Sequence, residues 1–131
     1  MALLLDGADR LMQHEDPPLM TFLLPRKRGE KVLFVPVSLM AGFAEELAFR
    51  GFLIHFIAKH LGSEAIAVLL SSLFFGLAHG YQRLSGVLRT GLIGLALAGL
   101  YLWQSSLLMV MAAHAMFDMV AGLLFGPDGE A

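Results

Sequence analysis

Four apolar stretches follow one another through most of the chain, and they constrain its fold more than any other feature. They cover residues 32–61, 64–79, 86–104 and 105–125. Each is as long, or nearly as long, as the roughly 20 helical residues that cross a bilayer. The chain is 57% hydrophobic and 15% charged, whereas charged residues make up about a quarter of an ordinary soluble domain. We therefore predict an all-α, polytopic membrane helix bundle of about four transmembrane helices.

Two of the stretches depart from the length of a regular span. Residues 32–61 are too many for one straight crossing, so we expect this helix to tilt, bend or project into water. Residues 64–79 are few, so we expect either that this helix ends below the membrane surface or that His79 and Gly80 lie in a water-filled cavity. Between these two stretches, Gly62 fits a helix stop and Ser63 fits an N-cap.

We divide the chain into an N-terminal interfacial and basic segment (1–31), a transmembrane core (32–126) and a C-terminal tail (127–131). The opening MALLLDGADR lacks the features of a secretory signal, and such a start is also expected of a fragment of a larger membrane protein. The absence of cysteine excludes disulfides and cysteine-based sites. Basic residues are too sparse outside one cluster to form a nucleic-acid-binding stripe, so no nucleic-acid partner is expected.

Basic residues are distributed unevenly around the four stretches. The segment PRKRGEK before the first stretch, and the connection between the second and third, carry most of them, whereas the opposite side holds Lys59. The positive-inside rule then places the N-terminus, residues 81–85 and the C-terminus in the cytoplasm.

Ionisable residues interrupt the first stretch at AEELAFRGF. An ionised group in hydrocarbon is costly unless it is paired or hydrated. Glu46 and Arg50 are four apart, so on a helix they share a face and can neutralise each other. Glu45 is rotated by about 100° and needs another partner, a proton or water. From this segment alone, a purely structural role for both glutamates is an equally good interpretation.

Two more polar sites lie in the second and fourth stretches. His79 follows Phe75 by four residues, so the phenyl ring can wall the imidazole. His114 and Asp118 are also four apart and fall near the middle of the fourth stretch, where a functional site is the default interpretation. The alternatives are an interfacial histidine and a self-satisfied hydrogen bond between His114 and Asp118. One cavity open to the cytoplasm is the simplest arrangement that hydrates all of these groups.

This set of side chains suits hydrolysis. A carboxylate and an imidazole can hold and deprotonate a water, while a second imidazole and a protonated or amide-like neighbour stabilise the oxyanion. A serine nucleophile is weakly supported, because the serines of the second stretch and those that begin the fourth lack a G-x-S-x-G elbow or a suitably spaced lysine. These serines are Ser71, Ser72, Ser105 and Ser106.

A metal site is the other chemical hypothesis. The zinc motif H-E-x-x-H is absent from the sequence. Glu45, His79 and His114 can nevertheless supply two nitrogens and one oxygen, the ligand set of some catalytic zinc sites.

The segments EELAFRGFL, FFGLAH and HAMFD carry, in this order, the motifs E-E-x-x-x-R, F-x-x-x-H and H-x-x-x-N/D. They closely resemble the CAAX prenyl protease and bacteriocin-processing family, also called the Abi family, over about residues 43–118. The resemblance implies an intramembrane, glutamate-dependent endopeptidase. It implies that Glu45 and His79 activate water and that His114 with Asp118 serves the oxyanion.

The resemblance also implies that Glu46 and Arg50 hold the motif helix. It implies a peptide or a prenylated protein as substrate, and an integral protein of a bacterial cytoplasmic membrane. Two departures from the family pattern matter. The chain is shorter than members with more spans, so helices that wall the cavity or admit substrate are expected to be missing. Asp118 stands where the prenyl-processing branch has asparagine, which weakens the case for a CAAX substrate and requires a protonated Asp118 if it is to donate a hydrogen bond.

The leading prediction is therefore a membrane endopeptidase with no certain cofactor. A catalytically silent immunity or scaffold protein of the same family is the alternative, and the presence of every expected polar residue counts against it. An ion or proton pathway would need several acids along one helix, and the sequence does not provide them.

Introduced cysteines test the predicted topology, because the chain has none of its own. Arg28→Cys and Ser85→Cys should react with a membrane-impermeant thiol reagent from the cytoplasmic side, and Ser63→Cys should react from the opposite side. Labelling of positions 28 and 63 from the same side would contradict the four-helix topology.

Overall fold

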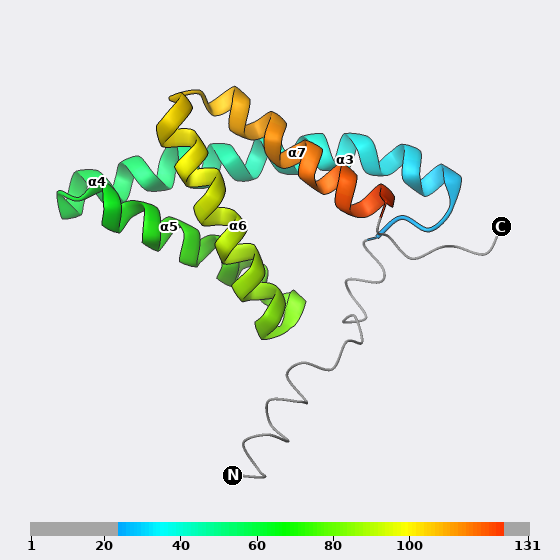
Figure 1. The fold of residues 1–131 in the computed structure, drawn as a ribbon, viewed down its shortest axis with the longest axis horizontal. Coiled ribbons are helices and arrows are strands. Elements are labelled where there is room, and N and C mark those ends of the chain that lie inside the picture. Colours follow the sequence, from blue (N-terminus) through cyan, green and yellow to red (C-terminus); the bar gives the residue numbers. More distant parts are fainter. Residues whose placement is uncertain (1–23, 125–131) are drawn as a thin grey trace, which may run out of the picture.

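The computed structural model describes residues 24–124, and this part of the chain is almost entirely helical (Figure 1). The described residues contain no β-strand. The helices, in chain order, are α3 (Arg28–Glu46), the π-helix η1 (Leu47–Leu53), α4 (Ile54–Leu61), α5 (Glu64–Ala78), the short 3-10 helix η2 (Gly80–Gln82), α6 (Arg83–Gln104) and α7 (Leu107–Leu124).

One long helix is the spine of the molecule. α3, η1 and α4 follow one another without a break over 34 residues, Arg28–Leu61. α7 packs along α3, whereas α5 packs along α4, and α6 packs mainly on α5 and also contacts α7 (Figure 1). Both α5 and α7 also contact η1. The middle of the spine is therefore the place where the chain's separate helices converge.

The helix lengths agree with a membrane protein. Among the described residues, Arg28–Leu61, Gly80–Gln104 and Leu107–Leu124 are long and apolar enough to cross a membrane, and α5 is a shorter apolar helix. At about 1.5 Å per residue the spine is about 51 Å long, more than the roughly 30 Å of a hydrocarbon core. The predicted all-α membrane bundle is confirmed, as are its overlong first helix and its short second helix.

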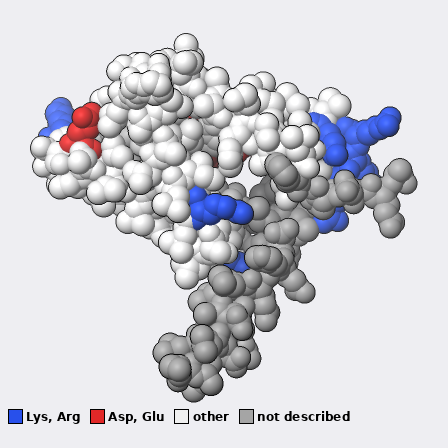
Figure 2. Space-filling model, in the orientation of Figure 1, with Lys and Arg blue, Asp and Glu red and all other residues white. Residues whose placement is uncertain are grey.

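Charge is concentrated at the end of the molecule where the spine begins. Arg26, Lys27 and Arg28 are exposed there. Figure 2 shows Lys and Arg gathered at this end, next to a surface that is otherwise largely uncharged. Large apolar side chains such as Leu33, Leu92 and Trp103 are exposed, as expected of helices whose outer faces meet lipid.

The predicted helix boundaries hold to within a few residues. The spine begins at Arg28 rather than at residue 32, and α6 begins at Arg83 rather than at residue 86. The predicted break is confirmed, because Gly62 has a φ of 66° and the Ser63 side chain accepts a hydrogen bond from the Ile66 N–H at 3.3 Å. Most of the predicted interfacial segment (1–23) and the predicted tail (127–131) lie outside the described residues.

The π-helix is a feature that the sequence analysis did not predict. Buried positions along the spine recur every four residues, at Ser38, Gly42, Glu46, Arg50 and Ile54. In an α-helix of 3.6 residues per turn, a step of four drifts around the axis by about 40° each time. The wider turn of η1 opposes this drift. One face of the spine can therefore pack on α7 in its first half and on α5 in its second.

Gly42 lets α3 and α7 approach closely. A Cβ at this position would lie 2.7 Å from the Met111 carbonyl oxygen and 2.9 Å from the Ala115 nitrogen. Both contacts are with backbone atoms, which cannot move aside cheaply. At Gly29, on the same helix, a Cβ would meet nothing within 4 Å.

These two glycines give a matched test of the α3–α7 contact. Gly42→Ala should lower the free energy of unfolding by about 1–3 kcal/mol because it overpacks the helix contact. Gly29→Ala should leave the stability unchanged or raise it, since alanine is the better helix former. Thermal unfolding of the purified variants in one detergent measures both effects, and equal midpoints would contradict the close approach.

Candidate active site

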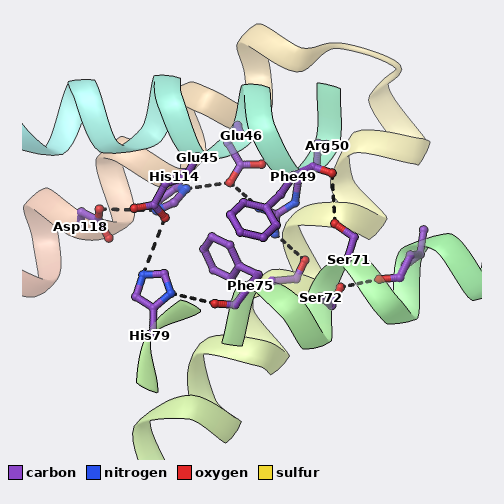
Figure 3. Close-up of polar contacts among 12 residues, drawn as sticks. Glu45, Glu46, Phe49, Arg50, Ser71, Ser72, Phe75, His79, His114 and Asp118 are labelled. Atoms are coloured by element: carbon purple, nitrogen blue, oxygen red, sulfur yellow. Dashed lines mark hydrogen bonds and ion pairs between the residues drawn. The ribbon is translucent and has the colours of Figure 1, made fainter. Parts of the chain in front are cut away.

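The structure brings every predicted site residue together at the middle of the spine (Figure 3). They come from the end of α3, from η1, from the C-terminal end of α5 and from the middle of α7. These residues are Glu45 and Glu46, Arg50, His79, and His114 and Asp118.

Glu46 and Arg50 form the predicted ion pair. Arg50 Nη1 donates to Glu46 Oε1 at 2.7 Å, and the side chains are only 1% and 0% exposed. Arg50 Nη2 donates to the carbonyl oxygen of Gly94 on α6 at 2.7 Å. The guanidinium carbon also lies 4.6 Å from the centre of the Phe75 ring. The pair is therefore sealed from solvent and ties the spine to both α5 and α6.

His114 makes a second hydrogen bond to Glu46. Its Nδ1 lies 2.7 Å from Glu46 Oε1, the same oxygen that accepts from Arg50. An oxygen that accepts from Arg50 has no proton of its own to give, so His114 Nδ1–H is the donor. The other ring nitrogen, Nε2, lies 3.5 Å from Asp118 Oδ2 and 3.9 Å from Glu45 Oε2. The Glu46 contact thus orients His114 so that Nε2 points to the remaining carboxylates.

His79 is oriented in a similar way. Its Nδ1–H donates to the Phe75 carbonyl oxygen at 2.8 Å, which leaves Nε2 with a free lone pair. The Phe75 ring lies 4.9 Å from the His79 ring and 5.8 Å from the His114 ring. The predicted packing of the Phe75 ring against His79 is confirmed, and the same ring also packs against His114.

Glu45 occupies the space between the two histidines (Figure 3). Its Oε2 lies 3.7 Å from His79 Nε2 and 3.9 Å from His114 Nε2. Both separations exceed the usual reach of about 3.2 Å for a hydrogen bond between nitrogen and oxygen. Oε2 is buried and has no hydrogen-bond partner among the described residues. A single water has the size and the protons to bridge these atoms.

The site therefore has a sealed side and an open side. Glu45 and Asp118 each keep 32% of the side chain exposed, and His79 keeps 15%. Glu46 and Arg50 are almost completely enclosed. The enclosed pair can hold the geometry, while the partly exposed residues can meet water and substrate.

The zinc ligand set of Glu45, His79 and His114 stays a prediction. Zinc ligands lie about 2.0–2.2 Å from the metal. The described part of the chain holds no group of three or more His, Cys, Asp or Glu side chains arranged to hold a metal ion.

The serines of the second stretch have structural partners. Ser71 Oγ donates to the Phe49 carbonyl oxygen at 3.0 Å, and Ser72 Oγ donates to the Val68 carbonyl oxygen at 2.8 Å. Neither bond resembles the serine–base contact of a nucleophile. The sequence analysis considered Ser71 only as a nucleophile, and no sequence signal showed that it reaches the spine.

The backbone of Gly94 is a second part of the site that the sequence analysis missed. A Cβ there would lie 2.9 Å from Phe75 Cδ1 and 3.4 Å from Arg50 Nη2. The four-residue spacing of Glu46 and Arg50 was the available signal that these two side chains pair, but it does not identify the acceptor on α6.

Comparison with known proteins identifies a family that this chain matches. The model of a family described as type II CAAX prenyl endopeptidase, Rce1-like, matches residues 28–120, more than half of the chain. No curated protein and no solved structure matches this chain.

Arg50 and Glu45 should respond differently to substitution. Arg50→Ala leaves Glu46 as an uncompensated buried charge and should cost about 3–5 kcal/mol of stability. Glu45→Gln keeps the shape of a partly exposed side chain and should cost much less. The yield of folded protein and the thermal unfolding midpoint measure both. Equal values for the two variants would show that Arg50 is not a structural partner.

Proposed function

The chain belongs to the type II CAAX prenyl endopeptidase Rce1-like family, and on this premise we propose that it hydrolyses peptide bonds in the membrane with a water activated by Glu45 and His79. The family and the apolar helices identify an integral membrane protein of the CAAX-type protease kind. One observation carries the finer proposal. Glu45 Oε2 faces the Nε2 atoms of both histidines and has no hydrogen-bond partner within residues 24–124.

The hydrogen bonds of His79 support its role at the water. Because Nδ1–H is committed to the Phe75 carbonyl, the neutral ring offers a lone pair at Nε2. A water about 2.8 Å from each partner can donate one proton to Glu45 Oε2 and the other to His79 Nε2. Its oxygen then keeps a lone pair for attack on a carbonyl carbon. The water gives one proton to Glu45 as the carbon–oxygen bond forms.

The hydrogen bonds of His114 constrain how it can serve the oxyanion. Since Nδ1–H is committed to Glu46, Nε2 can donate only if the ring carries protons on both nitrogens. Glu46 on one side and Asp118 on the other supply negative charge to balance such an imidazolium. Asp118 as a carboxylate then orients His114 and need not donate to the substrate itself. This removes the requirement that Asp118 be protonated.

The second half of the reaction returns the proton. Collapse of the tetrahedral intermediate breaks the carbon–nitrogen bond, and the leaving amine takes the proton that Glu45 received from water. The products are a carboxylic acid and an amine, and Glu45 is again a carboxylate. A peptide is therefore the proposed substrate. Cleavage of prenylated and unprenylated peptides of the same sequence would decide whether a prenyl group is needed.

Loss of either water partner should remove most of the activity. Glu45→Gln should lower kcat at least about a hundredfold with the protein still folded, because the proton acceptor is gone. His79→Ala should lower kcat to a similar value. The double variant should have no lower kcat than either single variant, because both residues act on one water. Hydrolysis of a peptide library by purified, reconstituted protein measures these rates.

Two control variants match these substitutions. His60 also follows a phenylalanine by four residues and bonds the Phe56 carbonyl through Nδ1 at 2.7 Å, but it is exposed. Glu64 is an exposed glutamate in the first turn of α5. His60→Ala and Glu64→Gln should keep wild-type rates. Wild-type hydrolysis by Glu45→Gln would show that the glutamate pair is structural. An inactive wild-type protein would favour the silent immunity or scaffold alternative.

A chelator separates water activation by side chains from a metal mechanism. Activity should persist after treatment with a strong zinc chelator and dialysis, because the proposed mechanism uses only side chains. A complete loss that added zinc reverses would assign Glu45, His79 and His114 to metal binding instead.

A further inference from the structure

Ser71, Phe75 and His79 lie four residues apart on α5, so they form one ridge along the helix. This ridge faces the spine. Ser71 contacts the backbone of η1, Phe75 contacts Arg50, and His79 Nε2 faces Glu45 across 3.7 Å (Figure 3). The position of α5 along the spine therefore sets how far His79 lies from Glu45.

Ser71 forms its hydrogen bond across a helix contact rather than within its own helix. A serine inside a membrane helix commonly bonds the carbonyl four residues earlier on its own helix. Ser72 does this with Val68 at 2.8 Å. Ser71, which is 1% exposed, instead donates across the helix contact to the Phe49 carbonyl oxygen at 3.0 Å. Two adjacent serines on one helix thus make one bond within α5 and one bond between α5 and the spine.

The Phe49 carbonyl is part of the π-helical turn itself. It also accepts the N–H of Ile54, five residues on, which is the hydrogen bond typical of a π-helix. The Phe49 ring packs edge-to-face on Phe75, with ring centres 5.1 Å apart and an interplanar angle of 88°. Ser71 and Phe75 therefore hold the same residue of the spine, one by its backbone and one by its ring.

We propose that Ser71 is a positioning residue of the site: its hydrogen bond to the Phe49 carbonyl fixes the register of α5 against η1 and so holds His79 opposite Glu45. This inference rests on the proposed function. Ser71 lies about two helical turns from His79 and touches neither water nor substrate in the proposed mechanism. Small displacements of a catalytic group lower rates strongly, so a bond at this distance can matter.

The expected effect is moderate and falls on kcat. A hydrogen bond between membrane helices shifts an equilibrium by about 3-fold on average and by about 20-fold at most. Ser71→Ala should therefore lower kcat by about 3- to 20-fold and leave KM within about twofold. Ser72→Ala, which removes a bond within α5 only, should keep the wild-type kcat.

Two further variants separate the hydrogen bond from packing. Ser71→Thr keeps the hydroxyl donor and should restore most of the wild-type kcat. Ser71→Cys keeps nearly the same volume but is a weak donor, so it should behave like Ser71→Ala. A Ser71→Cys variant with wild-type kcat would show that only packing matters at this position and would overturn the proposal.

Hydrogen–deuterium exchange gives a readout that does not depend on peptidase activity. Ser71→Ala should speed exchange of the backbone amides of residues 49–54, and Ser72→Ala should not. Equal exchange in the two variants, or an equal loss of kcat, would overturn the role of Ser71 in the register. A wild-type protein without peptidase activity would overturn the proposed function instead, while the exchange comparison would still decide whether Ser71 holds the π-helical turn.

Discussion

A single carboxylate oxygen, Glu46 Oε1, connects most of the structure. It accepts from Arg50 on the spine and from His114 on α7, both at 2.7 Å. Arg50 continues the connection to the Gly94 carbonyl on α6. In a low-dielectric interior such charge-assisted hydrogen bonds are strong, and an unmade one is costly. The same oxygen therefore neutralises a cation, orients the His114 ring and joins three helices, and the placement of Glu45 and His79 depends on that framework.

The sequence predicted those features that local rules govern. The four apolar stretches predicted the helices, Gly62 and Ser63 predicted the break between two of them, and the four-residue spacing of Glu46 and Arg50 predicted the ion pair. All of these follow from helix geometry and from the cost of charge in hydrocarbon. Because lipid-facing surfaces are as apolar as helix contacts, hydrophobic periodicity did not show which face of each helix is inward.

The features that escaped prediction depend on tertiary contacts. The π-helix is needed because α5 and α7 must share one face of the spine, and local sequence does not reveal that requirement. Gly94 acts through a carbonyl group, which every residue carries. The spacing F-x-x-x-H occurs at both His60 and His79, with the same local hydrogen bond, yet in the part of the chain that the structure describes only His79 faces a glutamate. The difference between the two lies wholly in what the rest of the chain places nearby.

The site lies near the middle of the long spine, and this position restricts which substrates can reach it. Glu45 lies about 26 Å along the helix axis from Arg28, which is more than half of the roughly 30 Å thickness of a bilayer's hydrocarbon core. A chain segment brought to this depth gives up hydrogen bonds to bulk water, and a folded globular domain is too wide to follow it between helices. Under the proposed function, the protein would select substrates by the flexibility and apolar character of a short segment rather than by an extended recognition sequence. Discrimination would then come from the cost of dehydrating the wrong peptide as much as from contacts with the right one.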